Sequence, residues 1–399
     1  MVELKKTPIG EIPKDWKVVK LGKVIMLKNG IRPLMSDNGQ YPVYGANGIM
    51  GYTSKYLIDQ EFTIIIGRVG ASGEVHLASG KIWVSDNAIY SEKYDTKKVY
   101  PPYLFYLLKY QKLSKFASKT THPILTQTFL TSFKIPLPPL PEQKKITEIL
   151  RTVDDAIEKT DEAIERTKRL KKGLMKRLLT RGIKHKRFKK TELGEIPEEW
   201  RVVRLGEIAE LKSGGTPSRK KPEYWENGVI PWVKSGELND EVIYETEEKI
   251  TEKAVRESSA KILPKGTLLF ALYGKGTVGK TAILGIEATT NQAVCGILPR
   301  NNAFVPRFMQ YYLIHKREQI LTQYVNPSSD VGRTNIYLSS LALLKLPLPP
   351  LSEQKQIVEI LSTVDRKLEL LRKRREKLER VKRGLMKDLL TGRRRVRIE

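Results

Sequence analysis

Two stretches of the chain carry apolar residues in the narrow stripe of a long helix. The apolar positions are separated mainly by three or four residues, and the stripe continues over about five turns or more, which is typical of a coiled-coil seam. A helix of about 40 residues is roughly 60 Å long. The predicted stripes are Leu150, Val153, Ile157, Ile164, Leu170, Leu174 and Leu178 in the first stretch, and Leu361, Val364, Leu368, Leu371, Leu378, Leu385 and Leu389 in the second.

Outside these stretches the pattern changes to short apolar runs that predict β-strands. Residues 62–66 and 81–84 are examples in the first half of the chain, and residues 267–272 and 293–298 in the second. A glycine-rich loop follows the first strand of each pair, as expected of a turn between strands. We therefore expect an α+β fold.

An internal repeat organises the whole chain. Residues 7–30 recur as 191–214 with 13 of 24 positions identical, and residues 134–158 recur as 345–369 with 17 of 25 identical. The offsets are 184 and 211, so the second half holds 211 − 184 = 27 extra residues between the two matching ends. Two copies of one scaffold therefore differ in what each presents. Trp16 and Trp200 occupy equivalent places in the repeat, and we expect both to be core anchors.

The repeat predicts two similar globular domains separated by two long antiparallel helices that form a coiled coil, with pseudo-two-fold symmetry. The equal length of the two helical segments fits helices that pack on each other; packing of each helix on its own domain is the alternative. The expected boundaries are 1–140 for the first domain, 141–184 for the first helix, 185–351 for the second domain and 352–395 for the second helix.

The charge of the chain favours a nucleic-acid partner. Lys and Arg outnumber Asp and Glu by 72 to 45, which gives a net charge of +27. An excess of one sign destabilises the compact state unless an anion neutralises it, and phosphate neutralisation releases counterions. The alternative is a surface of ion-pair networks, as in thermophiles, but such networks do not explain the one-sided sign. The terminal run Arg393, Arg394 and Arg395 is expected to be a solvated end.

Other residues exclude several classes of protein. Cys295 is the only cysteine and lies in an apolar run, so it reads as a small buried hydrophobe. The cysteine and histidines have no metal-ligand spacing, so we expect no metal site. The sequence has neither the apolar stretch of a signal peptide nor 18 consecutive apolar residues, so we expect a cytoplasmic protein without a membrane partner.

The order of the repeated motifs resembles a known family. Each half opens with GEIPxxWxxxxLG, continues through a variable region, and ends with LPLPPLxEQ (IPLPPLxEQ in the first half) and a helix that carries GLMKxLLT. This arrangement, which covers the whole chain, is similar to that of the specificity subunits of Type I restriction-modification enzymes.

The resemblance implies a function without catalysis in this chain. Each variable domain would be a target recognition domain that reads one half of a split, asymmetric sequence in double-stranded DNA. The paired helices would set the spacing between the halves and dock two modification subunits, which bring S-adenosylmethionine and methylate adenine. Restriction subunits would add ATP-driven translocation and cleavage. We therefore expect no catalytic residue and no cofactor here. A non-specific basic coiled-coil DNA-binding protein is an alternative.

One segment matches the Walker A pattern of P-loop NTPases. Residues 274–281 read GKGTVGKT and follow an apolar strand. The corresponding loop of the first half, residues 67–75, lacks the Lys-Thr pair, and the residues after Thr281 favour a strand over the helix that a phosphate site needs. A basic glycine hairpin that touches DNA is the favoured interpretation, and a P-loop NTPase remains the alternative.

The candidate DNA contacts lie in glycine-rich loops and in the amide-bearing turns that follow them. Asn and Gln can bind adenine through two hydrogen bonds, and Arg or Lys can bind guanine. The alternative for the amides is that they cap turns. The candidates are Asn47, Arg68, Ser72, Asn87, Lys234, Ser235, Lys275, Lys280, Asn291 and Gln292.

Overall fold

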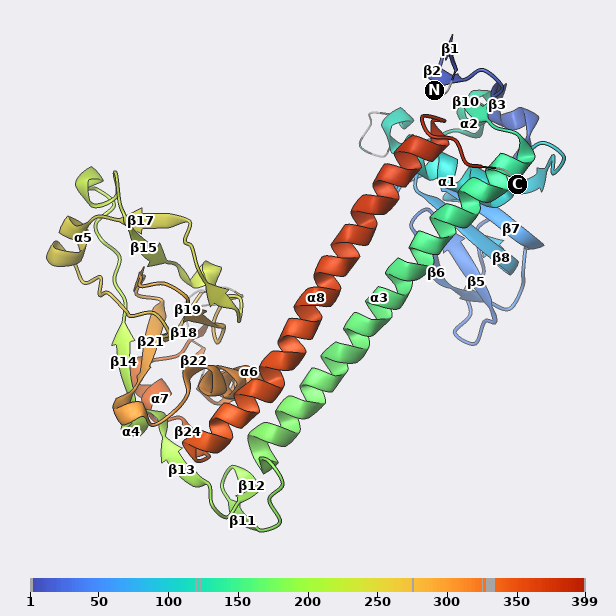
Figure 1. Ribbon diagram of the computed structural model, residues 1–399. Helices are drawn as coiled ribbons and strands as arrows, with labels where there is room; N and C mark the ends of the chain where they lie inside the picture. The colour runs from blue at the N-terminus through green and yellow to red at the C-terminus, as the bar shows by residue number, and fades with distance from the viewer. Residues whose placement is uncertain are drawn as a thin grey trace. The chain divides into compact units, whose positions relative to one another are not determined.

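The computed structural model divides into two compact units, each made of one globular head and one half of each long helix (Figure 1). Unit 1 comprises Met1–Ala163 and Leu371–Glu399, and unit 2 comprises Ile164–Leu370. The structure describes residues 3–118, 121, 123–274, 276–324, 326–327 and 334–397.

The head of unit 1 is built on a six-stranded sheet with the order β4-β9-β7-β8-β5-β6. All neighbours in it are antiparallel except β5 and β8, which are parallel. The predicted strands at 62–66 and 81–84 are confirmed within β7 and β8. The bounds are β4 Ile25–Asn29, β5 Tyr41–Gly45, β6 Gly48–Thr53, β7 Ile58–Gly67, β8 Val75–Val84 and β9 Ala88–Tyr94.

Short elements complete this head. Helix α1 begins at a Pro-Pro pair, because proline lacks the N–H that the first helical turn leaves unbonded, and its buried face packs against β7 and β8. The bounds are α1 Pro101–Gln111, α2 Gln127–Ser132, the 3-10 turns Leu21–Lys23 and Leu113–Phe116, the hairpin β1 Leu4–Thr7 with β2 Gly10–Pro13, and the pair β3 Lys17–Lys20 with β10 Lys134–Leu137.

Unit 2 contains a five-stranded sheet, β14-β21-β18-β19-β16, and a three-stranded sheet, β17-β15-β20. The predicted strands at 267–272 and 293–298 are confirmed as β18 and β21, and these two pair antiparallel. The bounds are β14 Ala209–Ser213, β15 Ile230–Val233, β16 Val242–Ile243, β17 Glu248–Ile250, β18 Leu268–Ala271, β19 Thr281–Leu284, β20 Thr289–Thr290 and β21 Val294–Pro299.

Two of the small sheets of unit 2 repeat those of unit 1. The hairpin β11 Phe188–Thr191 with β12 Gly194–Pro197 and the pair β13 Arg201–Arg204 with β24 Lys345–Leu348 match the two small sheets of unit 1. The remaining elements are α4 Leu205–Ile208, α5 Glu252–Glu257, α6 Pro306–Tyr324, α7 Leu338–Ala342, the pair β22 Asn326–Pro327 with β23 Thr334–Asn335, and the 3-10 turns Pro222–Tyr224, Ser235–Glu237 and Arg300–Asn302.

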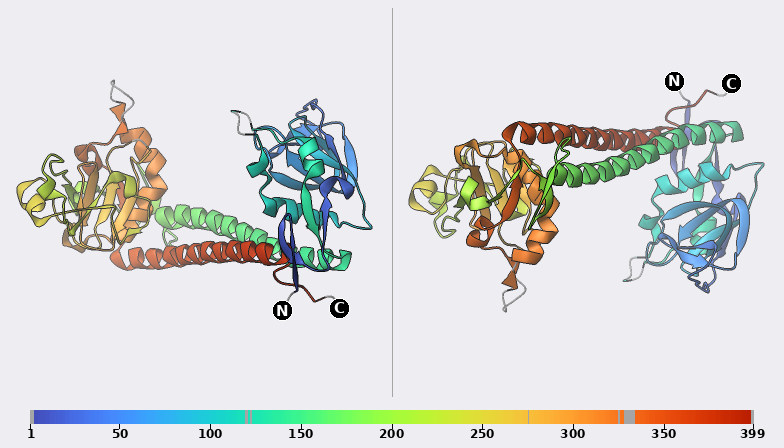
Figure 2. Two further views of the ribbon diagram at one scale, coloured as in Figure 1. Left: turned by 90° about the horizontal axis from the view of Figure 1, so that it is seen from above. Right: turned by 90° about the horizontal axis from the view of Figure 1, so that it is seen from below.

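The two long helices, α3 Leu140–Arg181 and α8 Leu351–Leu390, pack together and run antiparallel (Figures 1 and 2). In unit 1, Asp154 pairs with Lys382 and Asp161 with Arg375. In unit 2, Lys171 pairs with Asp365. Each of these pairs has residue numbers that add to 536, so both units use one register along the two helices.

The seam between the helices follows the apolar stripe with one correction. The prediction for Leu170 is wrong, because its side chain is 54% exposed. The regular three-four spacing continues from Ile164 to Thr167 and then to Lys171, and Thr160 and Thr167 are buried. A threonine can fill such a position with its methyl group, but a pattern based on apolar residue types does not include threonine. Among the predicted positions, Leu150, Ile157, Ile164, Leu361 and Leu368 are buried, and Val153, Val364 and Leu371 are half-buried.

A buried carboxylate at the start of each long helix holds the opening repeat of the same unit. Trp16 and Trp200 are fully buried, as predicted. The indole N–H of Trp16 donates to Glu142 at 3.0 Å, and that of Trp200 donates to Glu353 at 2.9 Å. A buried indole N–H needs such a partner. The tryptophan of the opener and the glutamate of LPLPPLxEQ are therefore two halves of one contact.

The glutamine of the same motif has an equivalent structural role in both units. Gln143 accepts the backbone N–H of Tyr100 at 2.8 Å, and Gln354 accepts that of Val305 at 2.9 Å. Gln143 also donates to the carbonyl of Pro138, as Gln354 does to the carbonyl of Pro349. The repeated Glu-Gln pair thus fixes the head to the helix.

Each head is also fastened to the helix pair through a tyrosine. The hydroxyl of Tyr106 donates to Asp154 at 2.7 Å, and the hydroxyl of Tyr311 donates to Asp365 at 2.6 Å. Both aspartates are also the partners of the lysines Lys382 and Lys171. Burial, followed by the hydrogen bond to Asp154, raises the pKa of Tyr106 far above its ordinary value.

A basic side chain completes each Trp–Glu contact. In unit 1, Arg395 donates to Glu142 at 2.6 and 2.9 Å and to Asp15 at 2.8 and 2.7 Å. In unit 2, His185 lies 2.9 Å from Glu353. The hydrogen bond to Arg395 lowers the pKa of Asp15. The expectation that the terminal arginines form a solvated end is therefore wrong for Arg395, whose partners lie hundreds of residues earlier in the chain.

Candidate nucleic-acid interface

Three loops of unit 1 that hold predicted DNA contacts meet one another. They are the β5–β6 turn, the β7–β8 loop and the β8–β9 turn. The backbone N–H of Ser85 donates to the carbonyl of Tyr44 at 2.9 Å, and that of Arg68 donates to the carbonyl of Asn87 at 2.9 Å. The loops that the sequence names separately are one hydrogen-bonded cluster.

Unit 2 builds the same cluster with the same bonds. The backbone N–H of Asn291 donates to the carbonyl of Val233 at 3.0 Å, and that of Leu272 donates to the carbonyl of Ala293 at 2.8 Å. These bonds match the unit 1 bonds one for one. We call the two sets the loop clusters: residues 44–48, 67–74 and 85–87 in unit 1, and residues 233–236, 271–274, 276–280 and 291–293 in unit 2.

A glycine closes each cluster against the end of the opening repeat. A Cβ on Gly30 would lie 2.1 Å from the carbonyl oxygen of Ser85, and a Cβ on Gly214 would lie 2.3 Å from that of Thr290. Any other residue would push the turn away. The two glycines are equivalent in the repeat, so the scaffold that both halves share ends where the variable loops begin.

The amide-bearing turns align in a way that separates two roles. In unit 1, Ser85 accepts the N–H of Asn87 on its hydroxyl oxygen at 3.3 Å. In unit 2, Asn291 accepts the N–H of Ala293 on its side-chain oxygen at 3.2 Å. Asn291 therefore caps its turn, which is the alternative that the sequence leaves open for the amides. Gln292, one residue further, is exposed, and its side-chain oxygen accepts the hydroxyl of Thr216, which leaves its NH2 group to donate.

The other candidates differ in how accessible they are. Asn47 and Asn87 are exposed, whereas Arg68, Ser235 and Lys280 are half-buried. Ser72 is buried, and its hydroxyl lies within hydrogen-bond distance of the carbonyls of Arg68 and Pro123. This arrangement gives Ser72 a role in shaping the β7–β8 loop. Lys275 lies outside the described residues.

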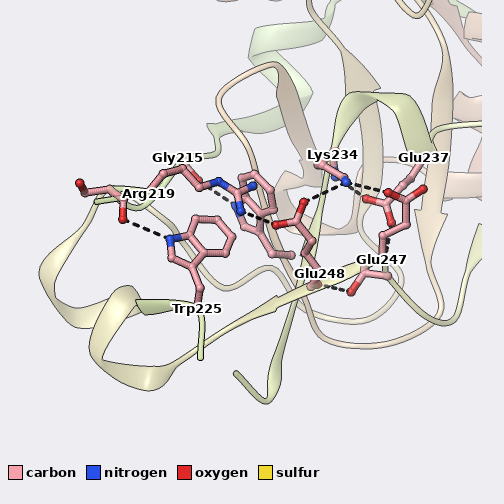
Figure 3. A network of polar contacts seen from close by, with 10 residues as sticks. Gly215, Arg219, Trp225, Lys234, Glu237, Glu247 and Glu248 are labelled. Carbon is pink, nitrogen blue, oxygen red and sulfur yellow. Dashed lines mark hydrogen bonds and ion pairs between the residues drawn. The ribbon is translucent and has the colours of Figure 1, made fainter. Parts of the chain in front are cut away.

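Lys234 is held in a network of acidic side chains (Figure 3). Its ammonium pairs with Glu247 at 2.6 Å and Glu248 at 2.9 Å, and these bonds raise its pKa. Its backbone N–H donates to Glu237. The negative charges of the two carboxylates offset the positive charge of the ammonium toward a phosphate, so Lys234 is a weaker candidate than its sequence position indicates.

The same network fixes the segment that follows Gly214. The guanidinium of Arg219 lies 3.6 Å from the ring centroid of Trp225 and pairs with Glu248, whose pKa it lowers (Figure 3). The indole N–H of Trp232 donates to the carbonyl of Gly215 at 3.0 Å. The segment is thus pinned beside the loop cluster of unit 2.

The Walker A match does not form a phosphate cradle. Residues 276–279 form a turn between the antiparallel strands β18 and β19, and Thr281 begins β19. A P-loop needs a helix N-terminus directly after the lysine and threonine. The interpretation as a glycine hairpin is therefore confirmed for the backbone. Arg68 of unit 1 has no basic counterpart here, because the hydrogen-bond register aligns it with Leu272.

A polar hollow of about 690 Å³ lies next to the loop cluster of unit 1. It is open to solvent, and two basic residues, Lys20 and Arg68, line it together with amide and hydroxyl side chains. Such a surface suits a phosphate oxygen. Lys20 is not among the DNA contacts predicted from the sequence. The signal for it was present, because the repeat places Arg204 at the same position in unit 2. The full lining is Lys20, Asn29, Arg68, Thr126, Gln127, Thr128, Thr131 and Ser132.

The described residues contain neither a metal-ligand group nor a membrane-spanning helix. No group of three or more His, Cys, Asp or Glu side chains that could hold a metal ion occurs among them. None of the helices in this part of the chain is long and apolar enough to cross a membrane.

The fold and the paired loop clusters define a class of protein, and a family model identifies it. The model of the Type I restriction modification DNA specificity domain matches the chain twice, over residues 13–166 and 197–380. The chain belongs to this family.

Individual relatives match the whole chain or about half of it. The specificity subunit of the Type I restriction enzyme MjaVIII of Methanocaldococcus jannaschii is 32% identical over 97% of this chain and 94% of its own length. The EcoR124I/EcoR124II specificity subunit of Escherichia coli is 33% identical over 43% of this chain and 41% of its own length. The crystal structure of the S subunit from M. genitalium has the same fold, with a TM-score of 0.64 at 20% identity over 98% of both chains.

Proposed function

We propose that the chain is the DNA-recognition subunit of a Type I restriction-modification complex and that its two loop clusters read the two halves of a split, asymmetric DNA target. The observation that carries this proposal is the duplication itself. Both clusters are held by the same backbone hydrogen bonds, but the exposed side chains differ: Asn47 and Asn87 in one, Gln292 in the other. Two different half-sites require the same backbone arrangement in both clusters with different exposed side chains.

The division of labour follows that of other DNA-binding proteins. Basic residues such as Lys20 and Arg68 would hold backbone phosphates, while the exposed amides would read base edges in the major groove. The net charge of +27 supports strong, salt-dependent attraction to DNA. The rival P-loop interpretation loses its support, because Thr281 begins a strand and not a helix.

The long helices would set the distance between half-sites and dock the modification subunits. Leu170 and Val381 are equivalent positions in the repeat, and their side chains are 54% and 43% exposed. Exposed apolar residues at equivalent points on two helices suit two copies of one protein partner. In this proposal the catalytic groups, the S-adenosylmethionine and the ATP-driven steps belong to the modification and restriction subunits.

The test of DNA reading is a selection experiment on the complex reconstituted with its modification subunits. A pool of random duplexes is bound, recovered and sequenced for the native chain, for Asn87→Ala and for Gln292→Ala. We expect a bipartite consensus for the native chain. We expect Asn87→Ala to relax one half of the consensus and Gln292→Ala the other, each by about 1–3 kcal/mol at one base pair.

The control separates recognition from general affinity. Lys20→Ala is expected to weaken binding to all sequences alike, because a phosphate contact carries no base information. A pool that shows no consensus with the native chain would support the alternative of a non-specific basic DNA-binding protein and would overturn the proposal.

The docking proposal has its own test. Native mass spectrometry of complexes formed with excess modification subunit is expected to show two copies bound to the native chain and one bound to either Leu170→Glu or Val381→Glu. Two copies on both variants would place the docking surface elsewhere.

A further inference from the structure

A set of exposed apolar side chains borders the loop cluster of unit 1. They come from the segment that follows Gly30 and from the first residues of β6. We call this set the apolar rim: Ile31 (53% exposed), Leu34 (77%), Met35 (49%), Ile49 (53%) and Met50 (52%). Met35 lies against Gly51 of β6, and the backbone N–H of Ser36 donates to the carbonyl of Tyr52 at 3.0 Å, so the segment runs beside β6. Adjoining apolar side chains of this size that are exposed to water mark a binding surface.

Hydrogen bonds and packing hold the apolar rim beside the candidate reading loops. The backbone N–H of Ile31 donates to the carbonyl of Val84, which directly precedes the amide-bearing turn, at 2.9 Å. The indole N–H of Trp83 donates to the carbonyl of Ile31 at 2.7 Å. Met50 lies against Gly45, at the base of the turn that carries Asn47. The apolar rim and the exposed amides Asn47 and Asn87 therefore belong to one surface.

The equivalent segment of unit 2 has the opposite character. The offset of 184 aligns Pro33 with Pro217, Leu34 with Ser218 and Met35 with Arg219. Arg219 is stacked on Trp225 and paired with Glu248 (Figure 3). A protein partner that docks in the same way on both units would need apolar side chains at the equivalent positions of both units. The difference instead suits a ligand whose two contacted parts differ, as the halves of an asymmetric DNA target do.

We propose that the apolar rim of unit 1 contacts thymine methyl groups in the major groove, so that the half-site read by unit 1 includes at least one thymine recognised through its methyl group. The C5-methyl of thymine is the apolar group that base pairs present in the major groove, and amides such as Asn47 and Asn87 suit adenine. Both observations point to A·T base pairs. The inference rests on the proposed function and adds base chemistry to it.

The test removes the methyl group alone. Duplexes that carry the selected target are made with deoxyuridine in place of thymine at one position at a time and bound to the complex with modification subunits. At one or more thymines of the unit 1 half-site we expect about a four-fold loss of affinity, the value for one buried methyl group. In the unit 2 half-site, any loss of affinity on replacing thymine by deoxyuridine is expected to be the same with and without the side chains of Leu34 and Ile49.

Two variants assign the effect to the apolar rim. Leu34→Ala and Ile49→Ala change exposed side chains, and each is expected to weaken binding to the thymine duplex and to reduce the difference between thymine and deoxyuridine. Ser218→Ala, at the unit 2 position equivalent to Leu34, is the matched control and is expected to leave that difference unchanged. Circular dichroism checks that each variant is folded.

The outcomes distinguish this inference from the proposed function. A unit 1 half-site that is selected but contains no thymine, or whose thymines tolerate deoxyuridine, overturns the inference and leaves the proposed function intact. Loss of modification-subunit binding by Leu34→Ala with unchanged base preference would make the apolar rim a protein interface and also overturns it. The absence of any base preference overturns the proposed function itself.

Discussion

Replacing Glu142 with glutamine keeps the shape of the side chain and removes its charge from the junction between head and helix in unit 1. The carboxylate is fully buried and is bonded to Trp16 and Arg395. Glutamine can still accept the indole N–H through its one carbonyl oxygen. It cannot accept both bonds from Arg395, and its amide N–H groups face the donors of the guanidinium.

The size of the loss in stability depends on the partners that Arg395 retains in the variant. Removing one partner of a buried ion pair costs about 3–5 kcal/mol, because the other charge is left unpaired. The Arg395 side chain is 31% exposed and retains Asp15, so water and a second carboxylate reduce the loss. We therefore expect unit 1 to lose about 2 kcal/mol of free energy of unfolding, which is about a 30-fold rise in its open population.

Hydrogen–deuterium exchange followed by mass spectrometry measures this locally. Peptides covering β3, β10 and the first turns of α3 are expected to exchange about 30-fold faster in Glu142→Gln, while peptides of the unit 2 head stay unchanged. Glu353→Gln is the matched control in unit 2 and is expected to give the reverse pattern. Equal acceleration in both heads, or none in either, would refute the assignment of these carboxylates as separate junctions.

Three further predictions concern the thiol, the pH dependence and the helices. Burial raises the pKa of the fully buried Cys295 to about 12, so a thiol reagent at pH 8 is expected to label it only when unit 2 opens. Labelling should not accelerate in Glu142→Gln, because that change opens unit 1. Fast labelling of the native protein would contradict the burial. Burial raises the pKa of Tyr94 to about 12. The contribution of this tyrosine to stability is therefore complete below its unfolded pKa of about 10 and is lost as the pH rises to 12. Tyr94→Phe should flatten the fall of the free energy of unfolding in that pH window, and an unchanged slope would contradict this assignment. Deleting residues 162–168 together with 368–374 keeps Asp161 opposite Arg375 and Lys171 opposite Asp365 and retains Leu170. At about 1.5 Å per residue the deletion should shorten the DNA spacer by about 3 base pairs without changing either half-site, as read by selection, and an unchanged spacer would refute the spacing role.

The sequence predicts the architecture because the repeat and the apolar spacing are local signals. The helix pair, the strands around residues 62–66 and 293–298 and the buried Trp16 and Trp200 all follow from residue types at fixed intervals. What the sequence does not predict is which distant residues share a contact. The sequence does not predict that Trp16 contacts Glu142 or that Arg395 contacts Asp15, because those bonds depend on which distant segments the fold brings together.

The candidate site shows the same limit at finer scale. The sequence identifies the loops correctly as neighbours of strands, but not how each side chain is used. Asn291 and Gln292 are adjacent amides, yet the first caps its turn and the second is exposed. Lys234 reads as a free cation until Glu247 and Glu248, more than ten residues later, are placed beside it. Residue type suggests a chemistry, and only the three-dimensional neighbours decide whether that chemistry is available.

The most direct measurement of the central claim is a head exchange. Residues 30–133 of this chain are replaced by the corresponding segment of a related specificity subunit, and the sites methylated by the reconstituted complex are mapped by sequencing. If each loop cluster reads its own half-site, one half of the target changes to that of the donor, and the other half and the spacer stay the same. A change in both halves, or in neither, would contradict the account.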